Sequence, residues 1–109
     1  MRVSGYRLMW VLVMFDLPTD TQDAKKRYRL FRGALLDCGY RMLQFSVYAR
    51  SAASEEAAKA QAQRIKGVIP PNGQVRVLCL TDKQFSRMEV FVRKLKVFTE
   101  KAPEQLEFF

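Results

Sequence analysis

The sequence contains no histidine, and this absence excludes several kinds of active site. A Ser-His-Asp triad, a Cys-His dyad and a histidine-ligated zinc ion all depend on the imidazole ring. Any catalysis by this chain must therefore use carboxylates, a metal ion, or lysine and tyrosine side chains.

Cysteines and long apolar runs are scarce as well. Cys38 and Cys79 are too few for a disulfide framework, match no metal-ligand spacing, and lie in apolar contexts typical of buried, reduced thiols. The run LMWVLVMF, residues 8–15, is much shorter than the ~18 residues of a membrane span. The N-terminal MRVSGYR lacks the apolar core and cleavage site of a signal peptide. We therefore expect a cytoplasmic protein with no membrane partner.

Acidic residues are outnumbered by basic ones. The 109 residues include 19 Lys and Arg against 11 Asp and Glu, which gives a net charge of +8. At this length we expect a single domain, residues 1–109, and the hydrophobic content of 49% is enough for a core. The charge excess predicts an anionic partner, most often nucleic acid. The alternative is a solvated basic surface that only aids solubility.

Apolar patterns, caps and turn residues predict four strands and two helices. The strands are expected at 6–16, 40–50, 74–81 and 88–93, and the helices at 22–38 and 54–67. We interpret this set as an α+β, ferredoxin-like β-α-β-β-α-β fold, with both helices on one face of an antiparallel sheet.

The second face of this sheet needs a cover. In the predicted strand 40–50, alternation assigns Met42, Gln44, Ser46 and Tyr48 to that face. A two-fold homodimer is the economical solution, and residues from about 104 to 109 form a candidate strand for exchange with the partner protomer.

Asp16 stands at the carboxyl end of the first predicted strand, immediately before Leu-Pro. One carboxylate is a poor magnesium site, but two copies across a dimer axis would supply two. A metal ion held there could activate water and neutralise charge on a phosphodiester. The alternative is that Asp16 only caps the turn before Pro18.

A basic cluster in the first helix is the second candidate site. Five cations lie within the eight residues KKRYRLFR: Lys25, Lys26, Arg27, Arg29 and Arg32. An exposed helical face of this kind binds phosphates with salt-sensitive, sequence-indifferent affinity, or is simply solvated. Arg41, Arg50 and Lys59 are candidates to extend it.

Two polar side chains of the predicted strand 40–50 are further candidate site residues, and two nucleotide-binding motifs are absent from the sequence. Ser46 and Tyr48 either support the site or pack at an interface. Glycine-rich nucleotide-binding loops are absent, and the strand QVRVLCLT lacks the aromatic rings of an RNA-recognition domain.

Three ordered motifs resemble a known family. MFDLPTDT, then AKKRYRLFRGALLDCGY, then RMLQFSVYAR is similar to the Cas-two (Cas2) family of CRISPR-associated proteins, and Gln44, Phe45, Ser46 and Val47 match its Gln-x-Ser-Val pattern. LTDKQFSRM, residues 80–88, resembles the version found in type II CRISPR systems.

The resemblance implies a function in antiviral defence. Members of this family form ferredoxin-like homodimers that bridge two dimers of the integrase Cas-one (Cas1), and the complex inserts double-stranded DNA protospacers as new spacers. Some members are described as Mg²⁺- or Mn²⁺-dependent endonucleases acting on RNA or DNA. By resemblance, Asp16 is the metal ligand and catalytic residue, and the basic helix is the DNA-backbone surface. A free-standing, toxin-like, metal-dependent endoribonuclease acting on messenger RNA is the alternative. Single-stranded RNA is a second candidate partner beside double-stranded DNA.

Overall fold

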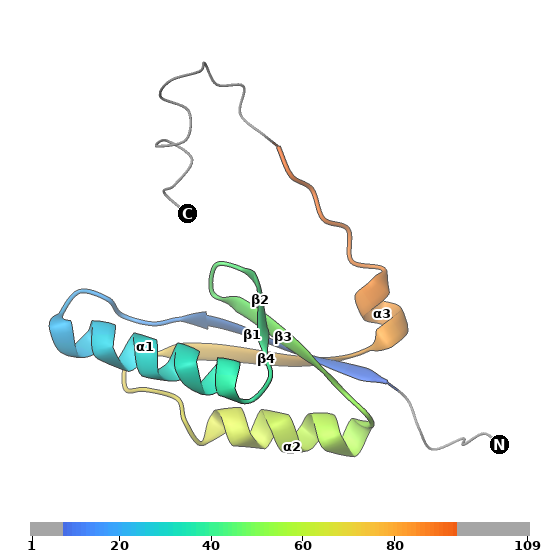
Figure 1. Cartoon of the computed structure of the whole chain (residues 1–109), viewed down its shortest axis with the longest axis horizontal. Helices are drawn as coiled ribbons and strands as arrows, with labels where there is room; N and C mark the ends of the chain where they lie inside the picture. The colour runs from blue at the N-terminus through green and yellow to red at the C-terminus, as the bar shows by residue number, and fades with distance from the viewer. Residues whose placement is uncertain (1–7, 94–109) are drawn as a thin grey trace.

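The computed structural model describes residues 8–93. The elements in this part are β1 (Met9–Asp16), α1 (Gln22–Asp37), β2 (Arg41–Gln44), β3 (Val47–Ala52), α2 (Glu55–Lys66), β4 (Gln74–Thr81) and α3 (Asp82–Ser86). The strands form one antiparallel sheet in the order β2-β3-β1-β4. Helices α1 and α2 lie on one side of the sheet and α3 on the other (Figure 1). Among residues 8–93, no helix is both long and apolar enough to cross a membrane.

The core lies between β1 and the two long helices. Val11, Val13 and Phe15 alternate along β1 and are buried together with Phe31 and Leu35 of α1. Because successive strand residues point to opposite faces, the residues between them project from the other face of the sheet. This alternation places Asp16, which follows Phe15, on the face opposite the helices.

Helix α1 is fixed at both ends. Thr21 Oγ1 accepts a hydrogen bond from the Ala24 N–H at 3.0 Å, which makes Thr21 the N-cap. At the other end Gly39 adopts a left-handed φ of 89°, as a glycine at this position allows. Arg50 Nη1 donates to the Cys38 carbonyl at 2.5 Å and so satisfies one of the terminal carbonyls.

The predicted single strand at 40–50 is wrong, because this segment folds as the β2–β3 hairpin. Ser46 takes a left-handed φ of 63° in the turn, and its carbonyl accepts from the Phe15 N–H at 3.1 Å. The turn reverses the chain, so the alternation predicted across it does not continue. Tyr48 is consequently buried on the helix side of the sheet rather than on the open face.

The β-α-β-β-α-β order is present, but its strands differ from those predicted. The hairpin supplies two strands between α1 and α2, whereas the predicted ranges had placed only one there. The predicted strand at 88–93 is also wrong, since these residues form no strand after the short α3. The strand suggested for 104–109 and its exchange with a partner lie outside the described residues. Cys38 and Cys79 are free thiols, half-buried rather than fully buried as expected.

Helix α3 covers part of the open sheet face. Trp10 stacks on Phe85 with ring centroids 4.2 Å apart, and its Nε1–H donates to Asp82 Oδ1 at 2.7 Å. Next to this contact, Leu78 and Met88 remain exposed. An apolar hollow of about 360 Å³ lies here, lined by Leu12, Leu43, Gln44, Val47, Phe85, Ser86, Met88 and Val90.

Candidate nucleic-acid interface

Asp16 is the last residue of an inner strand, and its side chain is exposed. It pairs with Gln74 of β4, and Met14 pairs with Arg76. These residues and Phe15 line a shallow hollow of about 190 Å³. The predicted carboxylate therefore projects from the open face of the sheet, at the rim of a small depression.

One protomer does not provide a complete metal site. Within residues 8–93, no group of three or more His, Cys, Asp or Glu side chains could hold a metal ion. Asp16 offers one carboxylate, and the Gln74 amide stands opposite it in the register. Oxygen donors suit Mg²⁺ or Mn²⁺, but magnesium sites usually combine one or two carboxylates with waters and phosphate oxygens. The residues fit such an ion only as part of a site completed by phosphate or by a second carboxylate.

The backbone next to Asp16 is anchored by a close contact between Leu17 and Gly73, which the sequence did not predict. Leu17 is buried, and a Cβ atom added at Gly73 would overlap Leu17 Cδ2. The sequence PPNG predicts a turn here, but its contact with Leu17 depends on the tertiary fold. Asp16 is thus held between the β1–β4 pairing and the Leu17–Gly73 contact.

The five basic side chains predicted on α1 are all exposed, but they do not form one cluster. Lys25, Arg29 and Arg32 are spaced i, i+4 and i+7, so they follow one stripe along the helix. Lys26 lies beside this stripe, on the surface facing away from the sheet. Arg27 lies on the other flank of the buried face. We refer to Lys25, Arg29 and Arg32 as the basic stripe.

Arg32 is the member of the basic stripe whose position is fixed by a hydrogen bond. Its Nε–H donates to the buried Tyr48 hydroxyl at 2.7 Å. Tyr48 therefore supports a predicted site residue, although from the helix side of the sheet. Ser46 contributes its backbone conformation and carbonyl to the β2–β3 turn.

Arg50 does not extend the basic surface as suggested. Its guanidinium donates to the carbonyls of Cys38 and Ser51 and lies over the Tyr40 ring, 6.0 Å from the centroid. These contacts give Arg50 a structural role at the end of α1.

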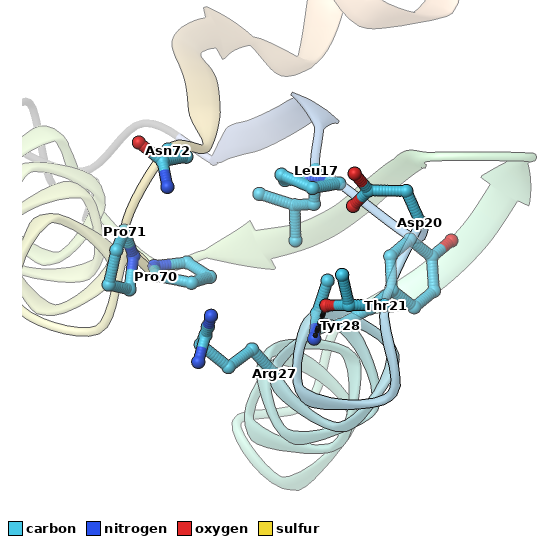
Figure 2. A pocket seen from close by; sticks show the side chains of 10 residues that line it. Leu17, Asp20, Thr21, Arg27, Tyr28, Pro70, Pro71 and Asn72 are labelled. Atoms are coloured by element: carbon cyan, nitrogen blue, oxygen red, sulfur yellow. Dashed lines mark hydrogen bonds between the residues drawn. The ribbon is translucent and has the colours of Figure 1, made fainter.

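Arg27 borders a separate pocket between α1 and the α2–β4 loop. In Figure 2 its side chain reaches from the helix toward Pro70 and Pro71. The pocket has a volume of about 240 Å³, and Asp20 and Tyr28 contribute to its lining. The structure thus separates Arg27 from the basic stripe.

Comparison with known proteins identifies the family. Residues 9–88 match the family described as CRISPR associated protein Cas2. The chain belongs to the Cas2 family. A Cas2 relative from Parvibaculum lavamentivorans is 48% identical over 93% of this chain and 100% of its own length. Another from Flavobacterium psychrophilum is 46% identical over 99% of this chain and 94% of its own length. Both relatives carry the name CRISPR-associated endoribonuclease Cas2.

Solved Cas2 structures share the fold. The crystal structure of Streptococcus pyogenes Cas2 matches with a TM-score of 0.56, covering 76% of this chain and 99% of that chain at 24% identity. A second Cas2 crystal structure matches with a TM-score of 0.53 at 20% identity, covering 85% of this chain and 98% of that chain. These likenesses confirm the ferredoxin-like architecture, and the family match confirms the resemblance seen in the sequence motifs.

Proposed function

We propose that this Cas2 protein is a CRISPR adaptation protein, the dimeric, nucleic-acid-binding partner of the Cas1 integrase in the acquisition of new spacers. The observation that carries this proposal is the basic stripe on the exposed surface of α1. Membership of the Cas2 family gives this surface its biological setting.

The dimensions of the basic stripe suit a nucleic-acid backbone. Lys25 and Arg32 are seven residues apart, which corresponds to about 10 Å along a helix. One DNA strand carries a charge every ~3.4 Å along the duplex axis, so this length faces about three phosphates. Arg32 is oriented by Tyr48 before the ligand arrives, which lowers the conformational entropy lost on binding.

The open sheet face supports the dimeric part of the proposal. Leu78 is 47% exposed and Met88 is 43% exposed, beside the apolar hollow next to α3. A second copy covering this face would remove these side chains from water and bring two Asp16 carboxylates toward a common axis.

Charge reversal tests the binding surface. We expect Lys25→Glu with Arg29→Glu to raise the Kd for a protospacer-length DNA duplex at least tenfold and to reduce its salt dependence. Arg64→Glu with Lys66→Glu, in the last turn of α2, changes the net charge equally and is the matched control. Fluorescence anisotropy at several salt concentrations measures both. Equal losses in the two variants would mean that only net charge matters and that the basic stripe is not the site.

A second candidate function is metal-dependent phosphodiester hydrolysis at Asp16. Its support is the exposed carboxylate on a rigid strand end, together with the endoribonuclease name of the two relatives. A bound Mg²⁺ or Mn²⁺ would supply charge neutralisation on the phosphodiester and activation of water. Asp16 would hold the ion through its carboxylate oxygens, and the pairing with Gln74 keeps that carboxylate at the rim of the hollow.

The hydrolytic candidate has a direct test. We expect cleavage of a single-stranded RNA oligonucleotide by the wild type to require Mg²⁺ or Mn²⁺ and to be absent in Asp16→Asn. Asp37→Asn removes the same charge from an exposed position at the end of α1 and serves as the control. Cleavage that persists in Asp16→Asn would assign the activity to another site or to a contaminant.

A free-standing, toxin-like endoribonuclease is the alternative to the adaptation role. It would act without Cas1, so expression of the wild type in a host lacking CRISPR proteins would stop growth, and expression of Asp16→Asn would not. The adaptation role predicts normal growth with both.

A further inference from the structure

The basic stripe and Asp16 lie on opposite sides of the sheet. Phe15 points into the helix layer, where its ring centroid is 5.1 Å from that of Phe31. Asp16 is the next strand residue and projects from the open face. A strand bound along α1 therefore does not have its phosphates at Asp16, and a phosphate at Asp16 needs a cation from the open face.

Arg76 is placed to supply that cation. It pairs with Met14, and Gln74 pairs with Asp16, so Arg76 is the diagonal neighbour of Asp16 on the same face of two paired strands. Diagonal neighbours of this kind have Cα atoms about 7–8 Å apart, within reach of a long side chain. Arg76 is exposed, and it is the one cationic residue among those lining the Asp16 hollow.

We propose that Arg76 binds the phosphate of the nucleic-acid strand that reaches Asp16. This inference rests on the proposed hydrolytic function, and it names the group that recognises its substrate. The Asp16 carboxylate alone repels a phosphodiester. A guanidinium donates two parallel N–H bonds to the non-bridging oxygens of a phosphate and offsets that repulsion.

The position of Arg76 on a paired strand also sets the register of the bound strand. The backbone of β4 pairs with β1 along its length, so the Cα atoms of Arg76 and Asp16 keep a fixed separation. A phosphate engaged by Arg76 would then lie within the hollow that Asp16 borders, beside the carboxylate that would hold a metal ion.

The test compares Arg76→Gln with Arg87→Gln, both in the full chain. Arg87 is exposed at the C-terminal end of α3, it is not among the residues that line the Asp16 hollow, and its loss changes the net charge equally. The probe is a single-stranded RNA oligonucleotide, and the readouts are its Kd across salt concentrations and the dimer mass by sedimentation. We expect Arg76→Gln to raise the Kd about tenfold and to lower the salt slope by about 0.7 for each lost phosphate contact. Arg87→Gln should change neither.

The outcomes separate this inference from the proposed function. Equal Kd values in the two variants, or dissociation of the Arg76→Gln dimer, would overturn the phosphate-binding role. Binding is measured without cleavage, so a failure of Asp16→Asn to abolish hydrolysis would contradict the hydrolytic candidate while the Arg76 result still stands. If the wild type binds no single-stranded RNA, the Arg76 proposal is wrong, whereas duplex binding by the basic stripe is unaffected.

Discussion

The Nε–H of Arg32 donates a hydrogen bond to the Tyr48 hydroxyl at 2.7 Å, and this bond ties the outer surface of α1 to β3. Tyr48 is 1% exposed and its ring stacks on Phe15, so its ring belongs to the core while its buried hydroxyl accepts from the exposed Arg32. A core residue thus orients one cation of the basic stripe.

Tyr48→Phe keeps the ring and removes the hydroxyl. We expect the free energy of unfolding to fall by about 1 kcal/mol, because a short hydrogen bond is lost and the exposed Arg32 is resolvated. Urea denaturation measures this change. Tyr40→Phe is the matched control, because its hydroxyl donates to Gln61 Oε1 at the longer distance of 3.4 Å and should contribute less. Equal losses in the two variants would contradict the role given to the Arg32 contact.

Tyr40 makes stability depend on pH in the alkaline range. Burial raises the pKa of Tyr40 from 10.0 to about 12, with the nearby Arg50 opposing the shift. The unfolded chain loses this proton near pH 10, so the contribution of neutral Tyr40 is complete below pH 10 and is lost as the pH rises toward 12. We expect the free energy of unfolding to decline over this interval and to decline less in Tyr40→Phe. If the free energy of unfolding declined equally with pH in the wild type and in Tyr40→Phe, burial would not be the cause of the pH dependence.

Gly73→Ala tests the anchor next to Asp16. The new Cβ would overlap Leu17 Cδ2 and lie 3.3 Å from the Pro70 carbonyl, so we expect a loss of about 1–2 kcal/mol in urea denaturation. Combining it with Leu17→Ala should give less than the sum of the two single losses, because the overlap is removed. Strict additivity would show that the two residues do not restrict each other.

Gly33→Ala is the opposite case and serves as a control for glycine substitution. Gly33 lies inside α1, and a Cβ there would meet nothing within 4 Å. We expect a gain of about 0.5–1 kcal/mol from the higher helix propensity of alanine. A loss at this position would show that space around α1 is more restricted than the structure indicates.

Much of the fold could be predicted from local sequence signals. The apolar run ending at Asp16 predicts β1. Asp20 or Thr21 is expected as the N-cap of α1 and Gly39 at its end, and the structure places the N-cap at Thr21. These signals depend on residues close together in the chain, so one sequence is enough to read them.

The β2–β3 hairpin could not be predicted from alternation. Ser46 is not a glycine, yet it takes a left-handed φ, and its carbonyl is held by the Phe15 N–H from a distant strand. The side on which Tyr48 points follows from that turn. The position of this turn therefore depends on a tertiary contact, which the alternation of residues 40–50 does not indicate.

The residues of the candidate site could be predicted from the sequence, but their arrangement could not. Asp16 and the five α1 cations are identified by residue type and spacing, and all are exposed as expected. Their arrangement depends on strand pairing: the register with β4 brings Arg76 beside Asp16, and the sheet separates both from the basic stripe. Asp16 and Gln74 are 58 positions apart in the sequence, so no local signal indicates that proximity.

Spacer acquisition in cells carrying Cas1 and the CRISPR array is the most direct test of the adaptation role. Asp16→Asn and the Lys25→Glu, Arg29→Glu variant are compared after each is shown to form a dimer. We predict wild-type acquisition with Asp16→Asn and loss of acquisition with the charge-reversed helix. Normal acquisition with the charge-reversed helix and loss with Asp16→Asn would contradict this prediction and make the metal-dependent reaction the principal function.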